Sequence, residues 1–164
     1  LYFKRKGIED FVEVARRMPD VRFIWLGSIN KWLIPASIRR LVEKDHPSNV
    51  EFPGYFKGAV FQGAMSGSDA FFFPSYEETE GIVVLEALAS KQHVILRDIP
   101  VYEGWISEES AELCHNVDEF VESLQKVLDG QVDKREAGYR VAQSRSIDDV
   151  AYQLVEAYRK VLEM

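Results

Sequence analysis

The chain has 164 residues, 46% of them hydrophobic and 29% charged, which suits one globular domain with its own core. The net charge is −7, and such an acidic chain lacks the positive surface that general nucleic-acid binding requires. No apolar run approaches the roughly 20 residues needed to cross a bilayer, and no secretory signal pattern is present. Because the first residue is Leu1 and not Met, we expect a fragment of a longer protein.

The single cysteine, Cys114, excludes an internal disulfide and lies in a strand-like segment. We expect it to be a small buried hydrophobic side chain in a reducing compartment. His46, His93 and His115 are scattered, and no cysteine or carboxylate pattern has metal-ligand spacing, so we expect no metal site.

Helical and strand-like patterns alternate along the chain. Helices are predicted where apolar residues recur at helical spacing, and strands where short apolar runs end at glycine, proline or asparagine. The helix over residues 81–90 is apolar almost all round, so we expect it to be buried. In chain order the elements are helix 8–18, strand 21–27, helix 35–46, strand 49–54, weak helix 60–68, strand 69–74, helix 81–90, strands 93–98 and 111–116, and helices 117–130 and 146–164.

This alternation of apolar strands with helices predicts an α/β fold, a Rossmann-like parallel sheet with helices on both faces. Right-handed crossovers then bring every strand-to-helix loop to one edge of the sheet, which is where ligands bind in such folds. Residues 27–30, 54–57, 74–80 and 98–105 should therefore meet in space.

A carboxylate, Glu86, interrupts the apolar run of the 81–90 helix and needs a partner if it is buried. The loop before it leads to a helix N-terminus, where free backbone N–H groups favour an anion. Glu78 lies in that loop, so the two carboxylates can bracket a ligand with a diphosphate and hydroxyl-bearing rings, such as a sugar nucleotide. From the residues alone, an internal ion pair of Glu86 is an equally good interpretation.

The stretch FPSYEETEGIVVLEALA resembles the donor-binding signature of family 4 retaining glycosyltransferases, which have the GT-B fold and carry two glutamates eight positions apart. Glu78 and Glu86 match those positions, with Pro74 and Ser75 before them and Gly81 and Leu85 between. FKRKG, FIWLG, NVEFPGYF and SDAFFFPS resemble further motifs of the family in the same order. The usual Gly-Phe-Gly is replaced by Thr79-Glu80-Gly81, and RDIPVYEGW replaces a glycine-rich turn. Both departures resemble the bacterial branch that glucosylates diacylglycerol.

The resemblance implies that residues 1–164 are one nucleotide-sugar-binding domain, the C-terminal half of a GT-B enzyme. Such a hexosyltransferase moves a hexose, in this branch glucose, from a UDP-sugar to a lipid or saccharide acceptor. The missing N-terminal domain would bind the acceptor, so we expect the fragment alone to be inactive. The final helix, 146–164, should either pack on its own domain or cross to that missing partner.

The resemblance also implies roles for single residues. Glu86 should accept hydrogen bonds from the ribose hydroxyls, and Glu78 should act catalytically at the transferred sugar. Lys6 should act catalytically by neutralising the leaving phosphate. The other implied donor-binding residues are Gly27, Tyr55 and Phe56, the last two near the base of the nucleotide, Ser75 and Thr79 in the loop, and Gly81, Ile82 and Val83, whose N–H groups would hold the diphosphate. Alternatively, Lys6 is a surface charge and Tyr55 a plain loop aromatic.

The implied enzyme uses no cofactor and no bound metal, with the UDP-sugar as donor substrate. The expected location is the cytoplasm, with attachment to the inner face of the cell membrane left open. Two other functions fit the same pattern less well. One is a non-enzymatic Rossmann-like interaction or regulatory domain, and the other is a related epimerase.

Overall fold

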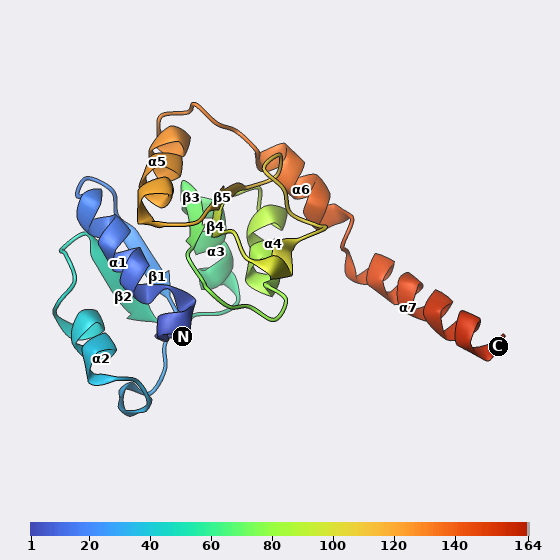
Figure 1. The fold of residues 1–164 in the computed structure, drawn as a ribbon, viewed down its shortest axis with the longest axis horizontal. Helices are drawn as coiled ribbons and strands as arrows, with labels where there is room; N and C mark the ends of the chain where they lie inside the picture. The colour runs from blue at the N-terminus through green and yellow to red at the C-terminus, as the bar shows by residue number, and fades with distance from the viewer. Residues whose placement is uncertain (164) are drawn as a thin grey trace.

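The computed structural model describes residues 1–163, which fold as alternating helices and parallel strands (Figure 1). Short 3-10 helices are labelled η. In chain order the elements are η1 (Lys4–Lys6), α1 (Ile8–Arg17), β1 (Phe23–Leu26), η2 (Lys31–Leu33), α2 (Ala36–Glu43), β2 (Val50–Gly54), α3 (Ala59–Gly67), β3 (Ala70–Phe73), α4 (Ile82–Ala89), β4 (His93–Arg97), η3 (Pro100–Tyr102), β5 (Glu112–Cys114), α5 (Val117–Leu128), α6 (Arg135–Gln143) and α7 (Ile147–Leu162).

The strands form two parallel groups, with β1 paired to β2 and with β3, β4 and β5 in that order. The predicted parallel pairing is confirmed, but within residues 1–163 no backbone pairing joins the two groups into one continuous sheet. One core nevertheless spans both groups. The ring of Phe11 on α1 stacks on Phe72 of β3 and meets Phe23 of β1 edge to face, with centroids 5.6 Å apart in both pairs.

Helices cover both faces of the larger sheet, because successive side chains of a strand point to opposite faces. In β4, Ile95 packs into the core under α1 and α5, whereas Val94 and Leu96 pack into the core under α3 and α4. The apolar strands are therefore buried from two sides, which is what their unbroken hydrophobic runs predicted.

The predicted elements are all present, with their ends shifted by a few residues. The sequence pattern did not reveal α6, a short helix that contains Gly138, a weak helix former. One expectation about α4 is wrong: the helix is not buried all round. Ile82, Glu86 and Ala89 form an exposed stripe at helical spacing, while Val84, Ala87 and Leu88 face the core.

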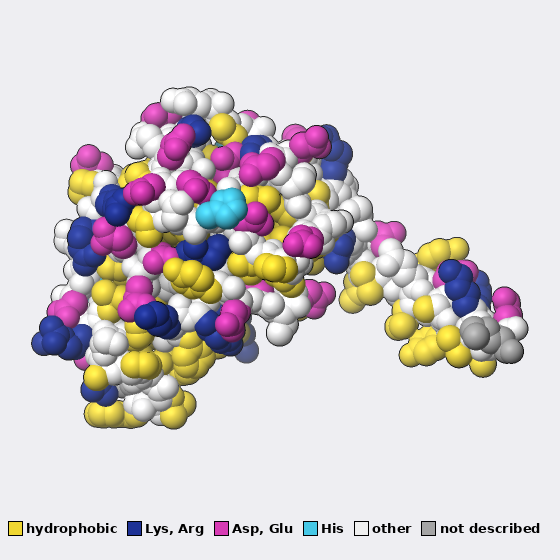
Figure 2. Space-filling model, viewed as in Figure 1, with side chains coloured by type: hydrophobic (Ala, Val, Ile, Leu, Met, Phe, Trp, Pro, Cys, Tyr) yellow, Lys and Arg dark blue, Asp and Glu magenta, His cyan; other side chains and the backbone are white. Residues whose placement is uncertain are grey.

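The last helix, α7, projects away from the body of the protein (Figure 1) and has no buried residue. The expectation that it packs on its own domain is therefore wrong. An apolar stripe lies bare along it, as the hydrophobic side chains on the projecting arm in Figure 2 show; it includes Val150, Leu154, Tyr158 and Val161. Met164, the last residue of the predicted helix, lies outside the described residues.

Candidate functional site

The loops that follow the strands lie at one edge of the parallel sheets. At the ends of β1 and β2, the N–H of Gly27 donates to the carbonyl of Gly54 at 2.8 Å, so the segments that begin at residues 27 and 54 meet as predicted. The loops that follow β3 and β4 meet as well, because Gly81 lies against Tyr102.

The segment before α1 is hydrogen-bonded to the loop that follows β3. The N–H of Tyr76 donates to the carbonyl of Arg5 at 2.8 Å. Gly7 has a left-handed backbone, with φ 74°, and a Cβ there would lie 2.2 Å from the carbonyl oxygen of Pro74. Only glycine fits this approach, which holds Lys6 beside the loop.

Lys6, Ser75 and Glu78, three of the predicted site residues, form one cluster. Nζ of Lys6 lies 2.5 Å from Oε1 of Glu78, and the hydroxyl of Ser75 donates to the same oxygen at 2.7 Å. The side chains of Lys6 and Glu78 are only 16% and 10% exposed, and Ser75 is buried. Lys6 is therefore not a plain surface charge, and the carboxylate that needed a partner in the fold is Glu78.

A second charged network, centred on Arg97, stabilises the loop that follows β3. Arg97, at the end of β4, is buried and donates to the carbonyls of Pro74 and His115, at 3.1 and 2.7 Å. It also pairs with Asp10 on α1, and its guanidinium lies 3.8 Å from the centre of the Tyr76 ring. The Tyr76 hydroxyl donates to the same Asp10 carboxylate at 2.6 Å, and this bond raises the pKa of Tyr76.

Sequence reasoning gave no role to Arg97, Asp10 and Tyr76, which position the site; of the three, only Tyr76 lies within the predicted signature. One signal was available: Arg97 ends the apolar strand HVILR, and a charge next to a buried strand needs partners. What the sequence could not show is that those partners come from α1 and from the loop after β3.

The N-terminus of α4 is open to a ligand. The N–H groups of Gly81, Ile82 and Val83 have no acceptor among residues 1–163, and no side chain caps the helix. Gly81 is left-handed, with φ 80°. Free N–H groups at the start of a helix are a binding site for an anion.

Glu86 lies on the exposed stripe of α4, one turn beyond Ile82. Its carboxylate has no hydrogen bond or ion pair within the described residues; only its backbone carbonyl accepts a bond, from Ser90. The internal ion pair that the residues alone left open is therefore wrong, and so is the idea that Glu86 is buried. The carboxylate is free to meet a ligand.

The remaining predicted residues follow strands at the same edge, and no hydrogen bond within residues 1–163 joins their side chains to the charged cluster. Tyr55 and Phe56 follow β2 and are exposed, and Thr79 is exposed in the loop before α4. Next to Thr79 lies a hollow of about 310 Å³ between the loops after β3 and β4. Its lining is Thr79, Glu80, Val101, Glu103, Gly104, Trp105 and Arg145.

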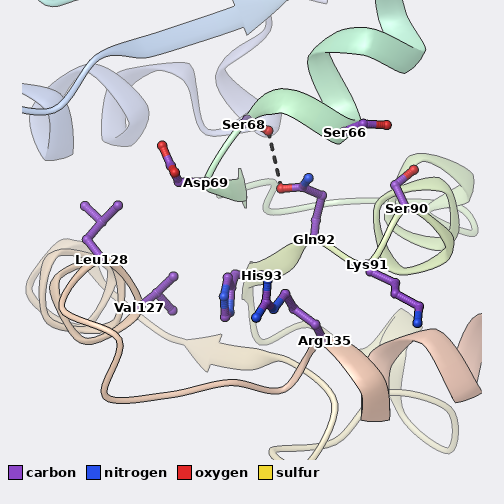
Figure 3. Close-up of a pocket in the computed structure, with 10 residues that line it drawn as sticks. All are labelled: Ser66, Ser68, Asp69, Ser90, Lys91, Gln92, His93, Val127, Leu128 and Arg135. Atoms are coloured by element: carbon purple, nitrogen blue, oxygen red, sulfur yellow. Dashed lines mark hydrogen bonds between the residues drawn. The ribbon is translucent and has the colours of Figure 1, made fainter.

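Another pocket, of about 280 Å³, lies near the opposite ends of β3 and β4 (Figure 3). Its two long cations are already paired, Lys91 with Glu136 and Arg135 with Asp133. Gln92 at its back is held by Met65 and Ser68. Because its two cations are paired and it lies away from the predicted edge, this pocket does not belong to the site.

No group of three or more histidine, cysteine, aspartate or glutamate side chains within residues 1–163 is arranged to hold a metal ion. None of the helices in that part of the chain has the length and apolar character needed to cross a membrane.

Comparison with known proteins agrees with this geometry. The profile of the family described as "Glycosyl transferases group 1" matches residues 2–145. The chain is 51% identical over 166 residues to the processive diacylglycerol alpha-glucosyltransferase of Acholeplasma laidlawii, covering 100% of this chain and 50% of that protein. It is 30% identical over 102 residues to the alpha-galactosylglucosyldiacylglycerol synthase of Streptococcus pneumoniae, covering 61% of this chain and 27% of that one.

Solved structures show the same fold at lower identity. A sucrose-phosphate synthase from Thermosynechococcus elongatus superposes with a TM-score of 0.84 at 23% identity, over 99% of this chain and 44% of that one. The pneumococcal O-GlcNAc transferase GtfA, solved with UDP and GlcNAc, superposes with a TM-score of 0.73 at 18% identity, over 99% of this chain and 35% of that one.

The chain thus spans half or less of the length of these relatives. The profile match over most of its residues, together with the 51% identity over its whole length, shows that it belongs to the group 1 glycosyltransferases, with the α/β architecture of the GT-B fold.

Proposed function

We propose that this chain is the nucleotide-sugar-binding half, C-terminal in the whole enzyme, of a retaining hexosyltransferase that takes glucose from UDP-glucose. The observation that carries the proposal is the cluster of Lys6, Ser75 and Glu78 beside the open N-terminus of α4. A cation, a carboxylate and free N–H groups together match a ligand with a diphosphate and a hydroxyl-bearing sugar.

Each part of the donor has a counterpart in the site. The diphosphate would lie on the N–H groups at the start of α4, with Lys6 turning from Glu78 to the phosphate oxygens. Glu78 would then accept hydrogen bonds from the sugar hydroxyls, and exposed Glu86 from the ribose. As the bond between sugar and phosphate breaks, negative charge grows on the leaving diphosphate, and a cation placed there in advance lowers the barrier.

Titration of UDP into the protein tests the proposal. We expect measurable binding, and a loss of about tenfold or more for Glu86→Gln, because two hydrogen bonds to a charged acceptor weaken. The variant should unfold at the wild-type temperature, since the Glu86 carboxylate has no partner within the described residues. Asp20→Asn, another exposed carboxylate but at the opposite ends of the strands, is the matched control and should bind UDP normally. Absence of UDP binding at millimolar concentration would overturn the proposal.

We assign charge neutralisation at the diphosphate to Lys6 and to the helix, not to a divalent metal. UDP should therefore bind with the same affinity in EDTA and in excess Mg²⁺. A tenfold or larger gain with Mg²⁺ would show instead that a metal bridges the phosphates.

The acceptor is proposed to be diacylglycerol or a glucosylated form of it, because the relatives with 51% and 30% identity are named for such lipids. Its binding is assigned to an N-terminal half that the full enzyme would supply, working in the cytoplasm at the inner face of the cell membrane. The bare stripe of α7 would pack on that half. The test is transfer of labelled glucose to diacylglycerol vesicles by the two halves together and not by this chain alone. Vesicles that stay unlabelled with both halves present would overturn this assignment.

A further inference from the structure

One buried hydroxyl near the site has no partner. Tyr102, at the end of η3, is 2% exposed, and its hydroxyl is the buried side-chain polar atom that lacks a hydrogen bond among residues 1–163. Nearly all buried polar side chains in proteins are paired, because an unpaired one costs about 1–3 kcal/mol. A phenylalanine would fill the same space without that cost, so the hydroxyl calls for an explanation.

The position of this hydroxyl is next to the open start of α4. A Cβ on Gly81 would lie 3.0 Å from Cε1 of Tyr102 and 3.5 Å from its hydroxyl oxygen. The ring is therefore packed against the first residue of the helix N-terminus, where the N–H groups of Gly81, Ile82 and Val83 have no acceptor among residues 1–163. The buried hydroxyl therefore lies beside the first of three residues whose N–H groups lack an acceptor.

The surroundings of the hydroxyl favour a neutral donor aimed at an anion. Burial, and then the charge of Glu78, raise the pKa of Tyr102 far above its ordinary value, so the phenol keeps its proton. Glu78 itself already accepts bonds from Lys6 and Ser75 and is not bonded to the phenol. No oxygen among residues 1–163 accepts a hydrogen bond from the phenol, so a ligand oxygen is the partner that we consider.

We propose that the Tyr102 hydroxyl donates a hydrogen bond to a phosphate oxygen of the diphosphate when the nucleotide-sugar lies at the start of α4. This rests on the function proposed above and adds Tyr102 to the binding site, as a fourth donor beside the three N–H groups. The ligand would approach from the hollow whose lining includes Glu80, which precedes Gly81, and Val101 and Glu103, which flank Tyr102 in the chain. Glu80 is exposed.

The test compares Tyr102→Phe with the wild-type protein, using UDP, inorganic pyrophosphate and uridine as probes. Affinity for UDP and pyrophosphate is measured by calorimetry, and uridine contact by saturation-transfer NMR. We expect a loss of roughly 10- to 100-fold for UDP and pyrophosphate, the usual effect of removing a donor to a charged oxygen, and no change for uridine. The free variant should unfold at the wild-type temperature or above it, because it no longer buries an unpaired hydroxyl.

Tyr139→Phe is the matched control, because Tyr139 lies on α6 and packs against Lys91, near the opposite ends of the strands. It should bind all three probes as the wild type does. Unchanged UDP affinity of Tyr102→Phe would overturn the inference, and lower stability with unchanged affinity would assign the hydroxyl to the fold. An equal loss for uridine would also overturn it, because the contact would then not be with phosphate. If the wild-type protein binds no UDP, the proposed function fails first, and that result is separate from these.

Discussion

Nζ of Lys6 and Oε1 of Glu78 lie 2.5 Å apart, although the two residues are 72 positions apart in the chain. Each was predicted to touch the donor, and the structure shows that each is also the partner of the other. The pair keeps two charges balanced in a poorly exposed place until a ligand arrives. Under the proposed function, a diphosphate would take over Lys6 and leave Glu78 free for the sugar.

Lys6→Met should destabilise the protein by about 1–3 kcal/mol, because it leaves the Glu78 carboxylate without its cation. The double variant Lys6→Met/Glu78→Gln should recover part of this loss, since neither charge then remains. Chemical denaturation of the single and double variants gives the coupling energy. If the losses of unfolding free energy from the two changes simply add, the pair does not act as a unit. The affinity for UDP should be low in both variants that lack Lys6.

Arg97→Met should lower the free energy of unfolding by about 2–4 kcal/mol, because it leaves Asp10 without its cation. It should also weaken UDP binding, because the loop after β3 loses its hydrogen bond to Arg97. Thermal unfolding and calorimetry measure the two effects. Arg22→Met is the control, since Arg22 also pairs with a carboxylate, Glu51, but in an exposed position, and the change should leave the unfolding midpoint unchanged. Equal destabilisation by both variants would contradict the role given to Arg97.

Gly7→Ala should destabilise the protein by more than about 2 kcal/mol, because the added methyl group meets the Pro74 carbonyl and the backbone is left-handed. Gly130→Ala is a matched control, with φ 68° and nothing within 4 Å of the new methyl group. It should cost only the backbone strain, about 1 kcal/mol. Similar costs for both variants would mean that Gly7 is not held against Pro74.

Cys114 is buried, and burial raises the pKa of its thiol from 9.0 to about 11. We expect almost no reaction with a disulfide reagent at pH 8 until the protein unfolds, because the thiolate is the reactive form. Since the folded pKa is the higher one, the thiol's contribution to stability is complete below pH 9 and is lost as the pH rises toward 11. In Cys114→Ala, this part of the loss of stability at alkaline pH should be absent. Fast labelling of the wild-type thiol at pH 8 would show that Cys114 is not buried.

Deleting α7 should leave the unfolding temperature and the UDP affinity of this chain unchanged, because no residue of the helix is buried. The same deletion should abolish pairing with the N-terminal half if the bare stripe packs there. Circular dichroism on heating checks the first expectation, and co-purification of the two halves checks the second. A clear fall in the unfolding temperature would place α7 on the body of the domain instead.

The sequence by itself predicted the order of strands and helices, because hydrophobic period and turn residues are local properties. The resemblance of its motifs implied the residues of the site, and their contact with a donor stays a prediction. It also predicted the edge at which Ser75, Glu78 and Gly81 gather, since parallel strands joined by helices allow one arrangement of their loops. It missed α6, a helix of nine residues with Gly138 near its middle.

Only the tertiary structure decided which carboxylate is buried. The pattern around Glu86 is apolar, yet that side chain faces solvent, while Glu78 in a polar loop is enclosed with Lys6. Burial depends on what packs over a residue from elsewhere in the chain, here η1, α1 and the end of β4. The same reason explains Arg97 and Tyr102: their neighbours are distant in sequence, and no local pattern records them.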